Sequence, residues 1–254
     1  MCQITQNIRR MVASLDSAKH RRETGCFVVE GSKCVLDTWG HFTCRHLLAT
    51  PAWIERNPDI AKTGDAVRAT KADMERMSHL STPPQVMAVY ELPSHDISTV
   101  NPSENLIIAL DRVQDPGNLG TIMRIADWFG IRDIVCSPDT VDAFNPKVIQ
   151  ATMGAISRVR VHYTPLAEYL GANAGKVPVC GTFLDGNNIY DTPLPRNGII
   201  VMGNEGQGIS DEVAKLADCR LFIPPFPQGV ETSESLNVGM ATAIIVSEFR
   251  RRLL

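Results

Sequence analysis

From about residue 104 the chain alternates uninterrupted apolar runs with helical segments, and this pattern restricts the fold more than any other feature. The runs expected to form strands are 106–110, 133–136, 159–162, 177–183, 198–202 and 220–223. Helices are expected at about 119–129, 147–155, 166–170, briefly after Ser210, and at about 235–251. Strands without polar alternation are buried on both faces, and their alternation with helices is typical of a parallel sheet covered on both sides. The sequence therefore predicts an α/β domain.

The first hundred residues have a different texture. Shorter strand and helix signals run from Cys26 to Tyr90, and a stretch rich in Pro, Ser and Asn follows at 92–103. That composition breaks regular structure and marks a linker. The 254 residues therefore divide into a smaller α/β domain at 1–98 and a larger one at 99–254.

The composition is that of an ordinary globular protein, with 44% hydrophobic and 21% charged residues. It excludes disordered, collagen-like and coiled-coil chains. Lys and Arg number 25 against 28 Asp and Glu, a net charge of −3, so RNA binding would need locally gathered positive charge. The longest mainly apolar uncharged run, Ser235 to Ser247, is too short to span a bilayer, and the first residues lack the core of a signal peptide. We expect a soluble cytoplasmic protein.

Neither metal binding nor a disulfide framework is indicated. The seven cysteines include no CxxC pair, and their odd number is typical of reduced thiols used as core residues. The six histidines are scattered, and the grouping of His41, Cys44 and His46 lacks the spacing of a zinc site. We expect no metal.

Positive charge gathers in the first 22 residues. Five basic residues face one acidic residue, Asp16, for a local balance of +4, and these five are Arg9, Arg10, Lys19, Arg21 and Arg22. Apolar residues at 4, 8, 11, 12 and 15 give the stretch the pattern of an amphipathic helix with a basic face. Such a face is either merely solvated or binds RNA phosphates, and the charge pattern alone leaves both interpretations open.

The first candidate motif follows the strand at 106–110. A turn at 115–118 leads into a helix at what we expect to be the carboxyl edge of the sheet, where ligands bind in open α/β folds. The turn holds Asn118 and Gly120, and Arg124 lies on the polar side of the helix. Arg124 could form a common surface pair with Asp127, or it could use its fork of donors to bind a phosphate or ribose. No dinucleotide GxGxxG fingerprint is present.

The second motif, Gly203-Asn204-Glu205-Gly206-Gln207-Gly208, follows the buried strand at 198–202. Its glycines permit close approach of a ligand to the backbone, and Glu205 could accept hydrogen bonds from a ligand. A plain turn leading to a helix cap at Ser210 is the alternative, and both can hold together.

The third motif places Ile223-Pro224 before Ser235-Leu236-Asn237-Val238, where the last helix begins. This helix is apolar nearly all round, so it must be buried on more than one side. The chain's own sheet covers one side, and we expect a second subunit on the other.

The three segments in this order and spacing strongly resemble the SpoU/TrmH family of the SPOUT superfamily, whose members are RNA ribose 2′-O-methyltransferases. The resemblance extends over about 150 residues, from Asn105 to the C-terminus. The N-terminal part is similar, less specifically, to the family's L30e-like substrate-binding domain, through 19–22 and 27–31.

The resemblance implies a deep trefoil knot after Gly198, a homodimer, S-adenosyl-L-methionine as cofactor and RNA as substrate, ribosomal rather than transfer RNA. Motif positions assigned to catalysis match Arg124, Asn118, Glu205, Ser235 and Asn237. Those near the cofactor match Met202, Gly203, Asn204, Gly208, Ile223 and Leu236. The spacer at 225–234 is longer than in the commonest members, so the cofactor lid can differ, and Glu231 and Thr232 receive no role.

Methyl transfer from a sulfonium to a ribose oxygen requires alignment of oxygen, methyl and sulfur. Arginine stays protonated and is a poor base, so the sequence favours Arg124 as a phosphate ligand and stabiliser of the emerging alkoxide. The alternative to an enzyme is a non-catalytic RNA-binding or ribosome-assembly protein that keeps the fold. The presence of Arg124, Asn118 and Glu205 favours the enzyme.

Overall fold

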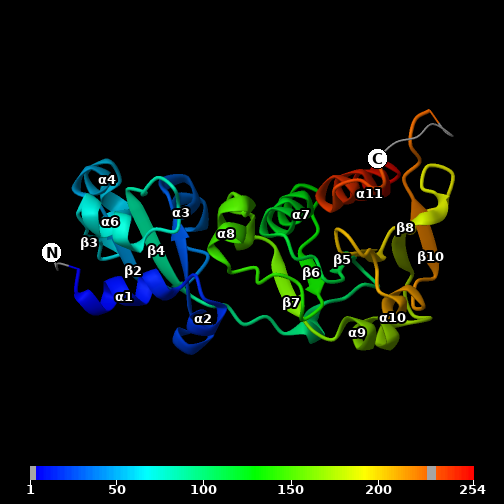
Figure 1. The fold of residues 1–254 in the computed structure, drawn as a ribbon, viewed down its shortest axis with the longest axis horizontal. Helices are drawn as coiled ribbons and strands as arrows, with labels where there is room; N and C mark the ends of the chain where they lie inside the picture. The colour runs from blue at the N-terminus through cyan, green and yellow to red at the C-terminus, as the bar shows by residue number, and fades with distance from the viewer. Residues whose placement is uncertain (1–3, 228–232) are drawn as a thin grey trace. The chain divides into compact units, whose positions relative to one another are not determined.

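The computed structural model describes residues 4–227 and 233–254 of the chain and divides it into two compact units (Figure 1). The N-terminal unit is Met1–Ser94 with Asp142–Ser157, and the C-terminal unit is His95–Val141 with Arg158–Leu254. The division expected at 98/99 thus differs from the structure in two respects. The boundary lies between Ser94 and His95, and the segment Asp142–Ser157 of the later half belongs to the N-terminal unit.

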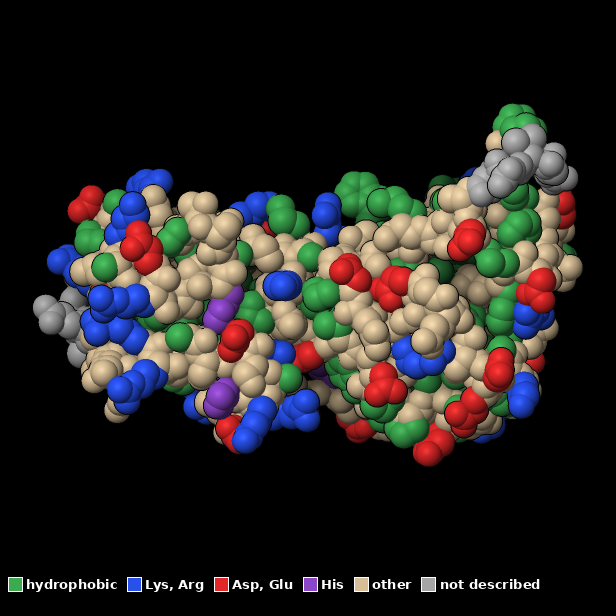
Figure 2. Space-filling view, viewed as in Figure 1, with side chains coloured by type: hydrophobic (Ala, Val, Ile, Leu, Met, Phe, Trp, Pro, Cys, Tyr) green, Lys and Arg blue, Asp and Glu red, His purple; other side chains and the backbone are tan. Residues whose placement is uncertain are grey.

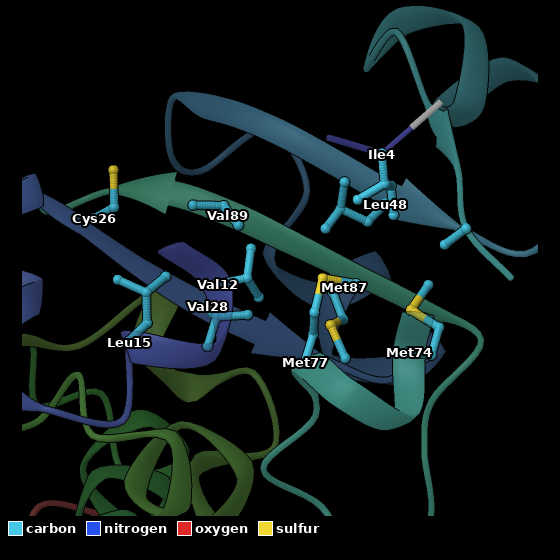
Figure 3. Packing of buried hydrophobic residues seen from close by; sticks show 11 residues of the cluster. Ile4, Val12, Leu15, Cys26, Val28, Leu48, Met74, Met77, Met87 and Val89 are labelled. Carbon is cyan, nitrogen blue, oxygen red and sulfur yellow. The ribbon is translucent and has the colours of Figure 1, made fainter. Parts of the chain in front are cut away.

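The N-terminal unit is built on a four-stranded sheet in the order β1-β4-β2-β3. The strands are β1 (Cys26–Glu30), β2 (Cys44–Ala49), β3 (Val67–Arg68) and β4 (Val86–Glu91), and β4 runs antiparallel to both β1 and β2. The helices are α1 (Gln6–Ser14), α2 (Ala18–Thr24), α3 (Ser32–Thr38), α4 (Pro51–Arg56), α5 (Pro58–Thr63) and α6 (Lys71–Met77). Figure 3 shows how Val12 and Leu15 pack toward Val28, Met77 and Met87 of this unit.

The segment 142–157 joins this unit through its apolar residues. It contains α8 (Pro146–Thr152) and the short η2 (Ala155–Ser157), and α8 packs against β1. The ring of Phe144 lies 4.8 Å from that of Phe27, centroid to centroid. Val148 and Ile149 of α8 are buried as well. Side chains that a regular α/β crossover would place on its own sheet are therefore buried in the N-terminal unit.

The C-terminal unit contains the predicted parallel sheet, in the order β10-β8-β9-β5-β6-β7. Every neighbouring pair is parallel. The strands are β5 (Leu106–Leu110), β6 (Asp133–Cys136), β7 (Arg160–Tyr163), β8 (Val179–Asn188), β9 (Gly198–Met202) and β10 (Cys219–Phe222). The α/β class with a parallel sheet is confirmed.

Helices cover both faces of this sheet. The pair α7 (Pro116–Trp128) and α11 (Val238–Arg251) packs together on one face, and α9 (Leu166–Asn173) and α10 (Asp211–Ala214) pack together on the other (Figure 1). The short η1 (Ile97–Thr99) precedes β5. The chain proceeds from β5 to β6 and β7 on one side, whereas β8 and β9 lie on the other, so the order switches beside β5. Ligands of open α/β sheets bind at the carboxyl ends of strands at such a switch.

The end of α11 is held by a charged clamp. Arg251 and Arg252 both donate to the buried carboxylate of Glu248, at 2.8 Å. Arg252 also donates to the backbone carbonyls of Ile189 and Tyr190 at 2.7 and 3.0 Å. The clamp therefore fastens the last helix to the segment that follows β8.

This clamp predicts a pH-dependent contribution to stability. Hydrogen bonds from Arg251 and then Arg252 lower the pKa of Glu248 to about 2, although burial acts in the opposite direction. A lowered pKa stabilises the fold above the unfolded value of about 4.3, and the contribution is lost as the pH falls toward 2. Glu248→Gln should cost about 1 to 2 kcal/mol in urea unfolding at pH 7. The difference in unfolding free energy between Glu248→Gln and the parent protein should become smaller below about pH 5. A difference that stays constant down to pH 2 would contradict the role of the clamp.

Candidate active site

The first motif forms a tight turn between β5 and α7. Asp115 caps the helix, since its Oδ1 accepts a hydrogen bond from the Asn118 backbone N–H at 2.8 Å. Pro116 occupies the first turn, where a missing N–H costs nothing. This cap starts α7 so that Asn118 is nearly buried in its first turn. The turn thus lies at the carboxyl end of the central strand.

The second motif folds back on itself directly after β9. Asn204 and Gly208 exchange backbone hydrogen bonds of 2.9 and 3.0 Å. The Oδ1 of Asn204 accepts from the backbone N–H groups of Gly206 and Gln207, both at 3.0 Å. A Cβ at Gly203 would lie 2.3 Å from the Gly208 carbonyl carbon. Since that atom is backbone and cannot swing away, only glycine fits at position 203.

A chain of three side chains joins the three motifs. Asn237 donates through Nδ2 to Oδ1 of Asn118 at 2.8 Å, and Asn118 donates through Nδ2 to Oε1 of Glu205 at 3.0 Å. Asn237 also caps α11, because its Oδ1 accepts from the N–H groups of Gly239 and Met240. Segments that lie 87 and 119 residues from Asn118 in the sequence therefore meet it at one point of the sheet edge.

The chain ends on a charged carboxylate. Partial burial acts to raise the pKa of Glu205, but hydrogen bonds from the Asn118 side chain and from backbone N–H groups, those of Asp115 and Gln114 among them, leave it lowered. Glu205 is therefore an anion at neutral pH and a weak proton acceptor. Because an anion only accepts hydrogen bonds, it orients the amide of Asn118, which in turn orients that of Asn237. The hydrogen bonds and the lowered pKa of Glu205 therefore fit a positioning role better than that of a base.

Arg124 lies exposed two turns into α7, with no hydrogen bond or ion pair to any residue that the structure describes. The surface pair with Asp127 does not form. Asp127 instead receives Nε and Nη2 of Arg158 at 2.9 and 2.8 Å. The guanidinium of Arg124 is therefore free to bind a ligand.

The residues predicted to lie near the cofactor have mixed surroundings. Met202 and Gly203 are buried at the end of β9, Asn204 and Ile223 are partly buried, and Gly208 is exposed. Leu236 is 50% exposed. Ser235 is exposed and forms no hydrogen bond within the described residues. Glu231 and Thr232 lie outside the described residues.

Sequence reasoning missed two residues that join the motif loops. The Oδ2 of Asp111 accepts the Ser210 N–H at 2.6 Å, and the carbonyl of Arg112 accepts Nδ2 of Asn204 at 2.7 Å. Arg112 has a left-handed backbone, with φ at 60°. The available signal was position, since both directly follow a buried strand at the ligand edge.

The five basic residues of the first segment do not share one environment. Arg10, Lys19 and Arg22 are exposed, and Lys19 lies 3.8 Å from Glu23. Arg9 is paired with Asp73 at 2.8 Å. Arg21 is only 1% exposed, and its guanidinium binds Asp142 and the carbonyls of Leu15 and Asp16. The prediction that Arg21 contacts RNA is therefore wrong, because this side chain is fully used inside the N-terminal unit.

Two absences concern the described part of the chain only. Among these residues, no three His, Cys, Asp or Glu side chains are grouped to hold a metal ion. None of the described helices is long and apolar enough to cross a membrane.

Comparison with known proteins agrees with this geometry. The SpoU rRNA Methylase family matches residues 105–247, and the MRM3-like substrate binding domain matches residues 6–88. A 23S rRNA guanosine 2′-O-methyltransferase of Bacillus subtilis is 30% identical over 247 residues, covering 93% of both chains.

Solved structures agree as well. A putative RNA methyltransferase of the TrmH family from Porphyromonas gingivalis is 40% identical, with a TM-score of 0.88 over 99% of this chain and 100% of its own. An AdoMet-bound rRNA methyltransferase from Sinorhizobium meliloti is 27% identical, with a TM-score of 0.87 over 100% of this chain and 98% of its own. The resemblance drawn from the three motifs is confirmed, and the chain belongs to the SpoU rRNA methylase family.

Proposed function

We propose that this protein transfers the methyl group of S-adenosylmethionine to a ribose 2′-hydroxyl of ribosomal RNA. Membership of the family establishes the broader activity, that of an RNA ribose 2′-O-methyltransferase with this cofactor. The observation that carries the proposal is the hydrogen-bonded chain Asn237–Asn118–Glu205, which joins all three motifs at the sheet edge, in the unit where Arg124 stands unpaired. A non-catalytic scaffold would need neither feature.

The segments proposed to hold the cofactor fit that role. Within the described residues, no backbone hydrogen bond involves Gly203, Ile223 or Leu236. Buried backbone groups are normally paired, so the unpaired groups of buried Gly203 suit a polar ligand that approaches the backbone. Met202, Asn204 and Gly208 complete this proposed surface. The bound cofactor supplies an electrophilic methyl group.

Catalysis then depends on charge placed by the protein. We assign Arg124 to the phosphate beside the target ribose and to the alkoxide that develops on the 2′-oxygen. Asn118, Glu205 and Asn237 hold the cofactor segment in place, and Ser235 precedes Asn237 by two residues in the sequence. Calorimetry with S-adenosylmethionine and no added metal should show binding. Absence of binding to both the cofactor and its demethylated product would overturn the proposal.

Ribosomal rather than transfer RNA is proposed on the names of relatives, including the 23S rRNA enzyme. Mapping of 2′-O-methyl groups in both RNA classes from a strain that lacks the gene tests this choice. A site lost from ribosomal RNA supports it, and a site lost only from transfer RNA contradicts it.

The N-terminal unit is proposed to be the L30e-like, RNA-binding part. By sequence it carries thirteen basic and eleven acidic residues, against twelve and seventeen in the C-terminal unit. Figure 2 shows several Lys and Arg side chains on the visible face of the N-terminal unit. The exposed residues Arg10, Lys19 and Arg22 are the main candidates for phosphate contacts, and Arg9 is a weaker one.

Replacing Arg10, Lys19 and Arg22 with alanine should weaken RNA binding and flatten its salt dependence. Each lost phosphate contact lowers the slope of log affinity against log salt by about 0.7 to 0.9. Filter binding across a salt series measures this slope, and Lys62→Ala with Lys176→Ala provides a control for loss of exposed charge elsewhere. An unchanged slope would show that the three residues form a solvated face and do not contact RNA phosphates.

A homodimer through α11 is proposed from its outer face. Met240 is 58% exposed and Ile244 is partly exposed, whereas Ile245 on the inner face is fully buried. Met240→Glu with Ile244→Glu should therefore convert a dimer into a 27.9 kDa monomer by sedimentation. Ile245→Glu is unsuitable for this test because it places a charge in the core. A parent protein that sediments as a monomer at micromolar concentration would contradict the proposal.

We also propose the trefoil knot after Gly198 and a cytoplasmic location. The knot is supported by the path of the last segment, which leaves β10 at one edge of the sheet and returns to pack on α7. The location is supported by the described cysteines, all six of which are free thiols. A crystal structure traced through residues 228–232, and cell fractionation, test the two statements.

A further inference from the structure

Trp128, the last residue of α7, is 84% exposed. Tryptophan has a large apolar ring and is highly buried on average, so an almost fully exposed one needs a reason. Its ring contacts no other aromatic ring and no cation within the described residues. By contrast, Trp53 is buried and donates to Ser32. Trp128 is thus an unused aromatic surface.

The position of Trp128 relates it to the proposed catalytic arginine. Arg124 and Trp128 are four residues apart on one helix, so they lie on the same face, about 6 Å apart along the axis. Both are exposed, and the helix that carries them holds Asn118 in its first turn. The acidic residue between them, Asp127, is already paired with Arg158. This face of α7 therefore presents an unpaired guanidinium beside an open indole ring.

We propose that Trp128 is a stacking platform for an unpaired RNA base next to the target ribose. This inference rests on the proposed role of Arg124. Proteins recognise single-stranded RNA by stacking its bases on aromatic rings and binding its phosphates with cations. One nucleotide supplies both partners, a phosphate for Arg124 and a flat base for Trp128.

The charge on this face decides between RNA and a protein partner. An apolar subunit contact over Trp128 would also cover the neighbouring guanidinium, and burying a charge without a partner is costly. Charged residues are accordingly depleted at the centre of protein interfaces. RNA neutralises the same charge. The structure therefore favours an RNA base over a second protein as the ligand of Trp128.

Three substitutions separate stacking from simple apolar contact. Trp128→Ala and Trp128→Leu should weaken binding of unmethylated ribosomal RNA by roughly 5- to 150-fold, the range for loss of one base–aromatic stack. Trp128→Phe keeps an aromatic face and should retain affinity within a few-fold. Affinity for S-adenosylmethionine and the mass in solution should not change. Leu184→Ala, which truncates another largely exposed apolar residue in the same unit, is the matched control.

Fluorescence gives a second readout that does not need activity. A single-stranded oligoadenylate should quench the tryptophan emission of the parent protein but not of Trp128→Phe, which keeps Trp39 and Trp53. The inference is overturned if Trp128→Leu binds RNA as well as the parent does. It is equally overturned if Trp128→Ala is a monomer in solution whereas Trp128→Leu remains a dimer, because that result would identify a subunit contact. Failure of the proposed role of Arg124 is distinct, because it would appear as undiminished methylation by Arg124→Ala. Failure of the proposed function would appear as absence of binding to S-adenosylmethionine and its demethylated product.

Discussion

Arg124→Ala is expected to lower the methylation rate by about 100- to 1000-fold, the usual effect of removing one group that stabilises developing charge. The affinity for S-adenosylmethionine should stay within a few-fold of the parent value, because Arg124 bonds to none of the described residues of the cofactor segments. Single-turnover transfer to ribosomal RNA from a strain that lacks the gene measures the rate, and calorimetry measures the affinity.

Two controls sharpen this result. Arg124→Lys should recover little activity, since a point charge cannot reproduce a planar fork of donors. Arg158→Ala removes a neighbouring guanidinium that pairs with Asp127, and its effect should be small, as for exposed ion pairs. A near-parental rate for Arg124→Ala would remove this residue from the mechanism.

The second large effect is expected when the donor of one hydrogen bond in the Asn237–Asn118–Glu205 chain is replaced with an acceptor. Asn237→Asp still caps α11, because aspartate is as good a cap as asparagine. However, it places an acceptor on both sides of the Asn118 amide, and Asn118 has its donor group on one side only. The Oδ1 of Asn118, a largely buried residue, then loses its donor, which costs about 1 to 3 kcal/mol. We expect cofactor affinity to fall roughly 5- to 150-fold while the helix content is unchanged.

A compensating change tests whether the chain is the cause. Glu205→Gln in the Asn237→Asp background allows the amide of Asn118 to turn over, so that the introduced glutamine donates to Asn118 and Asn118 donates to the introduced aspartate. The double variant should bind the cofactor better than Asn237→Asp alone, which a double-mutant cycle would show as a favourable coupling. The recovery should be partial, because glutamine has one acceptor oxygen for the backbone N–H groups that Glu205 binds. If the two substitutions lower cofactor affinity additively, the directions of the hydrogen bonds in the chain are not the cause of the loss.

The main elements of the C-terminal unit could be predicted because their signals are local. Strand 106–110 and strand 198–202 coincide with β5 and β9, since an unbroken apolar run can only be buried. The last helix begins at Val238 rather than Ser235, because Asn237 is its cap. In the N-terminal unit, α4 and α5 were not predicted, although Pro51 and Pro58 stand at their first positions.

Long-range packing accounts for what the sequence could not indicate. The sequence around Arg21 gives no indication that this residue binds Asp142, which lies 121 residues away and belongs to the same N-terminal unit. The same limit applies to removal of residues 1–98, which the charge pattern suggests as a test of RNA binding. That deletion would expose Phe144, Val148 and Ile149, so the combined alanine replacement of the three exposed basic residues is the better test. The pairing of Asp127 with Arg158 is a third case, 31 residues apart.

Methyl transfer by the purified protein is the most direct test of the proposed function. It is incubated with methyl-labelled S-adenosylmethionine and with ribosomal or transfer RNA from a strain that lacks the gene, and the RNA is then digested to nucleosides. We expect label in a 2′-O-methylated nucleoside from ribosomal RNA, and labelling slower by about 100- to 1000-fold when Arg124→Ala replaces the parent protein. Label on a base, or no transfer to either RNA by a protein that binds the cofactor, would contradict it.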